Sequence, residues 1–131
     1  MKKQSDGFTV IEILFIVILL GTASVLFFVQ KNDLSIISRD DKRKTSINAM
    51  YYGLEEVFYN ANKYYPQTIS SDNLKSVDPD LFTDSNGLKI GEAGSLYSYE
   101  PTNCIDQKCK SYTLKSSLEN EADSVKTSRN N

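Results

Sequence analysis

The sequence contains no histidine, no tryptophan and only two cysteines, Cys104 and Cys109. Without an imidazole, the chain lacks the commonest acid–base catalyst and a frequent metal ligand. Two cysteines alone are too few for a zinc site, and their spacing differs from the Cys-x-x-Cys pattern of redox proteins. No nucleophile–base arrangement or phosphate-binding glycine loop is present. We therefore expect no enzymatic activity, no cofactor and no zinc or redox centre.

Proline is scarce, and none of the three prolines precedes Pro66. Because proline is the strongest helix breaker, the first 65 residues can form one nearly continuous helix, from about Phe8 to Tyr64. Its first part, 8–29, is apolar all round, and its second part, 30–65, is amphipathic. Gly53 indicates that a strand packs closely against this face. The apolar positions of the second part recur every three or four residues, as in a helix face: Ile47, Met50, Tyr51, Leu54, Val57, Phe58, Ala61 and Tyr65.

Excess charge of one sign is also missing, since the formal net charge is −2. This balance argues against a general nucleic-acid-binding surface. The basic cluster Lys42-Arg43-Lys44 directly follows Asp40 and Asp41. Such mixed runs are typical of a solvated, salt-bridged helix face. We predict no nucleic-acid partner.

The chain does contain a long apolar run, residues 8–29, in which Glu12 is the one charged residue. At about 1.5 Å per residue this run is roughly 33 Å long, enough to cross the hydrocarbon core of a bilayer. Before it, Lys2, Lys3 and Asp6 give a net positive start, which favours a cytoplasmic N-terminus. The sequence therefore predicts a single-pass membrane protein with its C-terminal part outside.

Glu12 needs an explanation, because an ionisable group inside an apolar span is costly and usually marks a function. A simple interpretation is that its carboxylate lies close enough to the membrane surface to reach the headgroups. The apolar run itself could also be an uncleaved anchor or a secretory signal peptide cut near 21–23. Such a cut would leave the apolar residues 25–29 exposed on a secreted protein.

The combination of a short basic leader, Gly7, Phe8, Glu12 and an apolar span resembles the type IV pilins and the pseudopilins of type II secretion. The resemblance implies that prepilin peptidase removes residues 1–7 by cutting between Gly7 and Phe8, and that the new amine of Phe8 is N-methylated. It also implies that Glu12 pairs with the amine of a neighbouring subunit during assembly. The implied partners are copies of the chain, related pilins, the peptidase and the membrane assembly machinery. The implied location is the inner membrane and then an extracellular filament.

After Pro66 the pattern changes to short strands and turns. Residues 96–100 and 112–115 have strand composition, with Pro101 expected to end the first, and 88–91 is a weaker candidate. We expect an α+β fold in which a small antiparallel sheet in a 66–119 head packs on the long helix, and the family resemblance makes this fold pilin-like. The tail, 120–131, is polar and is expected to fray. Acidic turns near Asp84 leave an irregular calcium site open, although an EF-hand register fails.

Cys104 and Cys109 lie between the two predicted strands. Outside the cell they should be oxidised, so we expect a structural disulfide. Closing so short a loop stabilises the fold by only roughly 2 kcal/mol. Two functional hypotheses remain: a structural subunit of a pilus-like filament, and a membrane-tethered extracellular binding domain that never polymerises.

Overall fold

The structure, a computed structural model, describes residues 7–130 and divides the chain into two compact units, which meet between Ser35 and Ile36. The first helix, α1, covers Val10–Tyr52 and contributes residues to both units. The predicted leader charges Lys2, Lys3 and Asp6 lie outside the described residues.

The first unit is helical from Val10 onward, and every described side chain in it is exposed. Phe8, Ile11 and Phe28, for example, are 75%, 78% and 69% exposed. By length and composition the helix can cross a membrane. Because isolated apolar surface of this extent is unfavourable in water, the segment requires an apolar environment or partners.

In the second unit the helix continues through a change of helix type. A π-helical segment, η1, covers Gly53–Tyr59 and is followed by α2, Asn60–Asn62, which ends at Lys63 in the left-handed conformation. The predicted continuous helix is thus confirmed in extent, while its π-helical segment was not predicted. Gly53 does mark a close approach: a Cβ atom there would lie 2.6 Å from Cγ2 of Val77. The neighbour is a loop residue, not the predicted strand.

The π-helical segment changes which side chains face the core. Hydrogen bonds that span five residues make each turn wider than in an α-helix, so the regular spacing of the apolar face is interrupted. Ile47, Met50 and Leu54 are fully buried as predicted, but Val57 is 52% exposed. The charged residue Glu55 is buried instead, with 4% of its surface exposed.

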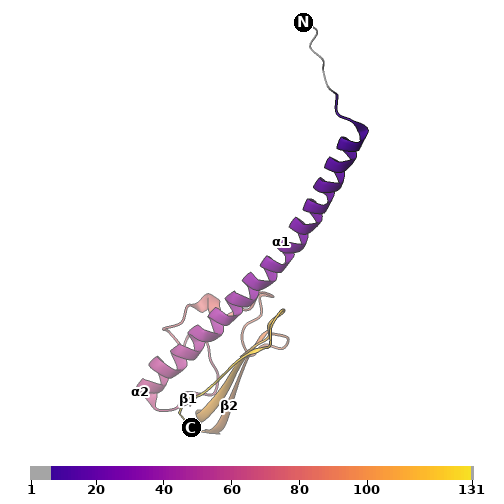
Figure 1. The fold of residues 1–131 in the computed structure, drawn as a ribbon. Helices are drawn as coiled ribbons and strands as arrows, with labels where there is room; N and C mark the ends of the chain where they lie inside the picture. Colours follow the sequence, from indigo (N-terminus) through magenta and orange to yellow (C-terminus); the bar gives the residue numbers. More distant parts are fainter. Residues whose placement is uncertain (1–6, 131) are drawn as a thin grey trace. The chain divides into compact units, whose positions relative to one another are not determined.

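The sheet is small and antiparallel. It contains β1 (Tyr65–Pro66), β2 (Tyr97–Ile105), β3 (Lys108–Ser116) and β4 (Ser124–Thr127). Strand β3 pairs with all three others, in the order β1-β3-β2 with β4 also on β3. The sheet packs with the C-terminal part of the helix (Figure 1). This arrangement confirms the predicted α+β layout.

Three strand predictions need correction. Pro101 does not end β2, which continues to Ile105; β2 lies at an edge of the sheet, where the missing N–H of proline does not interrupt the pairing. The weak candidate 88–91 forms only an isolated bridge between Lys89 and Thr83. The tail does not fray after Asn120, because β4 pairs with β3. The polar composition of this segment does not indicate a strand, but β3 supplies the hydrogen-bond partners for the backbone of β4.

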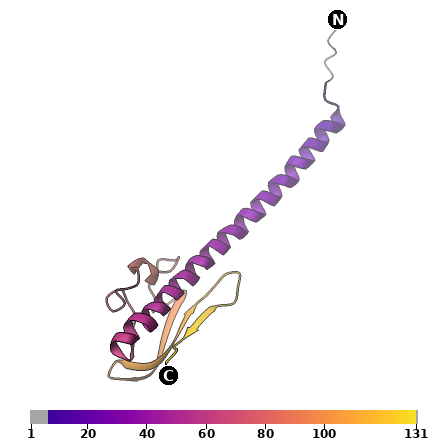
Figure 2. The same cartoon turned by 60° about the vertical axis from the view of Figure 1, so that its left-hand side comes forward.

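The connection between β1 and β2 consists of turns and a 3-10 helix, η2 (Pro79–Phe82), which the Asp78 side chain caps. Figure 2 shows this connection beside the helix, on a different side from the β2–β3 hairpin. Its apolar residues Ile69, Leu74, Val77 and Phe82 are buried and join the core. The connection therefore closes the helix face that the sheet leaves open.

Tyrosine rings fill the sheet side of the core. The rings of Tyr65 and Tyr112 meet edge to face at 4.8 Å, Tyr59 stacks on Tyr65 at 4.8 Å, and Tyr99 lies 5.4 Å from Tyr112. Tyr65 and Tyr112 are almost completely buried. Tyrosines in such a place bring large apolar area but require a partner for each hydroxyl.

Candidate functional site

The start of α1 is the candidate site predicted from the sequence. Thr9 and Glu12 form a reciprocal cap: the Thr9 amide and hydroxyl donate to Oε2 of Glu12 at 2.8 and 3.0 Å, and the Glu12 amide donates to Oγ1 of Thr9 at 3.3 Å. This capping box satisfies N–H groups that the first turn of a helix leaves without partners. Sequence reasoning missed it, although Thr-x-x-Glu before an apolar run is its signature.

Gly7 and Phe8 precede the helix and are exposed. A Cβ atom built on Gly7 would meet nothing within 4 Å, and the residue does not adopt a left-handed conformation. Neither packing nor backbone geometry therefore requires a glycine at this position. The bond between Gly7 and Phe8 lies in non-helical backbone, where a protease can bind it in an extended form.

Chemically, the site offers one carboxylate, Glu12, among exposed apolar side chains at the positive end of a helix dipole. Gly7, Phe8 and Glu12 lie within the first helical turn and the residues before it. The arrangement places an anionic group about one helical turn after an exposed, non-helical peptide bond.

The predicted disulfide is present in the second unit. Cys104 on β2 and Cys109 on β3 are bonded, and they are register partners in the hairpin. Cys109 is buried, whereas Cys104 is exposed. The bond thus fixes the tip of the hairpin, as predicted.

A buried carboxylate is the main feature that sequence reasoning missed. Glu55 accepts hydrogen bonds from the hydroxyls of Tyr65 (3.0 Å) and Tyr112 (2.8 Å) and from the backbone amide of Arg129 (3.2 Å). Burial, together with the nearby Glu55 charge, raises the pKa of the Tyr65 and Tyr112 hydroxyls above that of a free tyrosine. The cluster joins the π-helical segment, two strands and the C-terminal segment.

A second charged cluster replaces the predicted solvated helix face. Asp40 and Arg43 are buried, so the prediction of a solvated face is wrong for these two residues, although the predicted salt bridges exist. Asp40 accepts from the amides of Glu119 and Asn120 at 2.9 and 3.0 Å. Burial acts to raise the pKa of Asp40, but these amides and the Arg43 guanidinium outweigh it and lower the pKa. Arg39 and Arg43 both bind the Glu119 carboxylate.

Asp84 was the centre of the calcium hypothesis. Its carboxylate accepts from the backbone amides of Asn86, Leu88 and Leu96 at 2.8, 3.0 and 2.7 Å. By accepting from the amides of Asn86 and Leu88, the Asp84 carboxylate stabilises the turn that directly follows it in the chain. Among residues 7–130, no group of three or more histidine, cysteine or acidic side chains is placed to hold a metal.

Comparison with known protein families, curated proteins and solved structures finds no match for this chain.

Proposed function

We propose that this chain is a structural subunit of a type IV pilus-like filament. In this proposal, prepilin peptidase cuts after Gly7, the amine of Phe8 is methylated, and α1 anchors the subunit in the inner membrane with its N-terminus inside before assembly. The observation that carries the proposal is the joint occurrence of Gly7, Phe8 and Glu12 at the start of an apolar helix that continues into an α+β head.

The exposed apolar surface supports this proposal. All described side chains before Ile36 are exposed, and the apolar residues of 8–29 surround the whole helix instead of one face. A bilayer covers such a surface before assembly, and the equivalent helices of neighbouring subunits cover it in a filament. The head needs no help from this segment, because it has its own core of buried side chains.

Gly7 gives independent support. A glycine that is required by the fold normally adopts a left-handed conformation or allows close packing, and Gly7 does neither. Its presence is therefore better explained by recognition of the sequence by a processing enzyme.

Glu12 has a role in both states of the proposed pathway. In the unprocessed chain its carboxylate caps α1 through Thr9. Processing creates a cationic amine on Phe8, next to the positive end of the helix dipole, where a cation is unfavourable. The Glu12 carboxylate of an adjacent subunit then neutralises this amine. In a low-dielectric environment such a pair selects one register, although desolvation offsets much of its energy.

The capping box favours a second candidate, a membrane-tethered extracellular domain that does not polymerise. Because the cap satisfies Glu12 within its own chain, the carboxylate has a structural role without any neighbour. The tether does not explain Gly7, which contributes nothing to the cap.

The decisive experiment is the intact mass and N-terminal sequence of the full chain, extracted from the membranes of its own cells. The matched control is Gly7→Leu, because open space around Gly7 allows the larger side chain without disturbing the helix. We expect the wild type to begin at a methylated Phe8 and the variant to keep Met1.

Two different results would contradict the proposal. A wild-type chain that begins at Met1 would leave the tethered domain as the function. A chain that begins near Ser24 would identify a secreted soluble domain, because the apolar segment would then be a conventional signal peptide.

A further inference from the structure

The dipeptide Asn86-Gly87 lies at the exposed tip of a turn in the connection between β1 and β2. An asparagine before a glycine is especially prone to spontaneous deamidation, because glycine has no Cβ atom to hinder attack by its own nitrogen. A Cβ atom built on Gly87 would meet nothing within 4 Å, so the surroundings leave the site open to water. Among the described residues, the side-chain amide of Asn86 has no hydrogen-bond partner.

Deamidation of an asparagine is a reaction within the chain. The Gly87 nitrogen bonds to Cγ of Asn86, and the bond between Cγ and the side-chain nitrogen breaks. Ammonia leaves with the proton that the Gly87 nitrogen gives up, and a five-membered succinimide ring remains. Water then adds to one of the two ring carbonyls and opens the ring. The product is an aspartate or, where water attacks the main-chain carbonyl, an isoaspartate, whose main chain is one methylene longer.

Closing the succinimide ring requires a backbone conformation that this turn does not have. The Gly87 amide donates to the carbonyl of Asp84 at 3.1 Å, and neither Ser85 nor Asn86 has a positive φ, as in a type I turn. The third residue of such a turn, here Asn86, has a ψ of about 0°. In a succinimide the Gly87 nitrogen eclipses the Cβ atom of Asn86, which requires a ψ far from this value. The turn must therefore open before the ring can form.

Asp84 holds the turn in this unreactive form. It is buried, with 6% of its surface exposed, and its Oδ1 accepts from the amides of Asn86 and Leu88 at 2.8 and 3.0 Å. Its Oδ2 accepts from the amide of Leu96, directly before β2, at 2.7 Å. The Asp84 amide donates to the carbonyl of Leu88 at 2.9 Å. Opening the turn breaks several of these bonds, and bonds to a charged acceptor are the stronger kind.

Arg43 anchors the same turn to the long helix. Its Nη2 donates to Oγ of Ser85 at 3.2 Å. Arg43 is itself buried and is held by salt bridges to Asp40 and Glu119. The turn is thus fixed both to the helix and to the start of β2.

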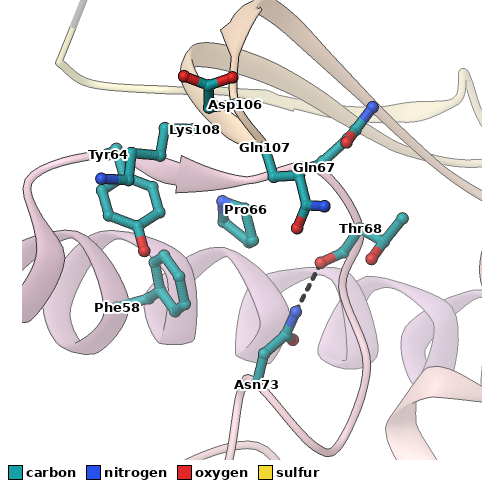
Figure 3. Close-up of a pocket in the computed structure, with 9 residues that line it drawn as sticks. All are labelled: Phe58, Tyr64, Pro66, Gln67, Thr68, Asn73, Asp106, Gln107 and Lys108. Carbon is teal, nitrogen blue, oxygen red and sulfur yellow. Dashed lines mark hydrogen bonds between the residues drawn. The ribbon is translucent and has the colours of Figure 1, made fainter.

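Asn73, in the same connection, has the opposite arrangement. Its Nδ2 donates to the carbonyl of Thr68 at 2.6 Å, the bond that Figure 3 marks with a dashed line, and its Oδ1 accepts from the amide of Ser70 at 2.9 Å. The next residue is Leu74, which is buried and carries a side chain beside the attacking nitrogen. Asn73 therefore serves as an internal reference that should stay unmodified.

We propose that Asn86 is a deamidation site whose rate is set by the opening of this turn, and that Asp84 is the residue that keeps the turn closed. An isoaspartate at position 86 lengthens the main chain inside the turn, so the two sets of bonds between Asp84 and Leu88 can no longer form together. A brief opening then becomes permanent, and the Leu96 amide before β2 loses its fixed acceptor. The inference depends only on the head, so its failure would leave the proposed filament role intact.

The test incubates the full chain in detergent micelles at neutral pH and follows the mass of the proteolytic peptide that contains Asn86. Chromatography of the digest separates the aspartate and isoaspartate products. The same chain, unfolded in guanidinium chloride, gives the rate without the turn. We expect the folded wild type to deamidate at least about tenfold more slowly than the unfolded chain, because reaction waits for local opening. Asn73 should stay unmodified in the folded chain.

Variants of Asp84 separate the turn from the rest of the head. In Asp84→Ala, Asn86 should deamidate at least about tenfold faster than in the folded wild type, because the carboxylate acceptor is gone. Asp84→Asn keeps an oxygen acceptor and should react at an intermediate rate, and it decides the test where Asp84→Ala does not fold. Tyr112→Phe is the matched control: it weakens the core but leaves the turn intact, so Asn86 should react at the wild-type rate.

Three results would overturn the inference. A folded wild type that deamidates as fast as the unfolded chain would show that the turn does not protect Asn86. A folded Asp84 variant that reacts no faster than the wild type would show that another contact keeps the turn closed. Equal acceleration in Tyr112→Phe would assign the protection to the stability of the whole head instead of to the turn.

Discussion

The Glu55 carboxylate accepts a hydrogen bond of 2.8 Å from the hydroxyl of Tyr112, a residue 57 positions later in the chain. This contact lies in the core and joins the π-helical segment to the central strand β3. A buried carboxylate is tolerated only where several donors surround it, and here Tyr65 and the Arg129 amide are also donors. Because these hydrogen bonds form in only one arrangement, the cluster fixes how β1 and β3 pack on the π-helical segment.

Removing the Glu55 carboxylate should strongly destabilise the head. Glu55→Ala leaves two buried tyrosine hydroxyls without their acceptor, at a cost of about 3 kcal/mol or more. Tyr112→Phe removes one donor from a carboxylate that keeps others, and should cost about 1.5 kcal/mol. Chemical unfolding of the full chain, followed by the circular dichroism of the tyrosines, measures both. Equal losses in the two variants would show that the carboxylate is not the centre of the cluster.

Stability should fall at alkaline pH. Burial raises the pKa of Tyr65, Tyr99 and Tyr112 in the folded state, whereas an unfolded tyrosine ionises near pH 10. Their contribution is therefore fully present below about pH 10 and is lost as the pH rises further, because only the unfolded state releases these protons readily. Melting temperatures between neutral and strongly alkaline pH test this. The melting temperature of Tyr112→Phe should fall less steeply with pH than that of the wild type. An identical fall would show that Tyr112 does not contribute to the alkaline loss of stability.

Stability should also fall in acid, through Glu119. The Arg39 and Arg43 guanidinium groups lower the pKa of Glu119 to about 2. Its contribution is present above the ordinary pKa of a glutamate, near 4.5, and is lost as the pH falls toward 2. Glu119→Gln should flatten this part of the melting-temperature profile. Because Glu119 is partly exposed, high salt should weaken the effect. An unchanged acid profile in the variant would exclude this role.

Gly53→Ala should destabilise the head although alanine is the better helix former by about 1 kcal/mol. The new Cβ atom would lie 2.6 Å from Cγ2 of Val77, a stiff β-branched side chain that is itself buried. We expect a net loss of about 1–2 kcal/mol from this overpacking. Gly53→Ala should lower the free energy of unfolding less in a Val77→Ala background than in the wild type, because the smaller alanine removes the clash. Strictly additive effects would show that the contact is not responsible.

Glu12→Gln separates the cap from the assembly role. Glutamine also serves in a capping box, so the helix should still begin near Val10, but the charge is gone. The filament proposal predicts that Glu12→Gln abolishes filaments in cells that process the chain normally. Thr9→Ala is the converse control: it loses the threonine cap, worth about 1 kcal/mol, but keeps the carboxylate. Electron microscopy and cell-surface shearing count the filaments; normal filaments in Glu12→Gln would refute the pairing.

The long helix, its apolar first part and the disulfide could be predicted from the sequence alone. Helical periodicity and the absence of proline before Pro66 are local properties, so they can be recognised without a partner. The disulfide was expected because Cys104 and Cys109 lie between predicted strands in a part of the chain expected outside the cell. The α+β layout also followed, because strand composition after Pro66 is local in the same sense.

The burial of the charged residues, in contrast, depends on contacts between distant parts of the chain. Asp40, Arg43 and Glu55 are charged residues of the long helix that sequence alone would place on its solvated surface, yet all three are buried. Their partners are up to 80 positions away, as for the amide of Asn120 on Asp40. The strand β4 in the polar tail has the same cause, since β3 supplies its hydrogen bonds. Burial of a polar group depends on distant donors and acceptors, which no local pattern specifies.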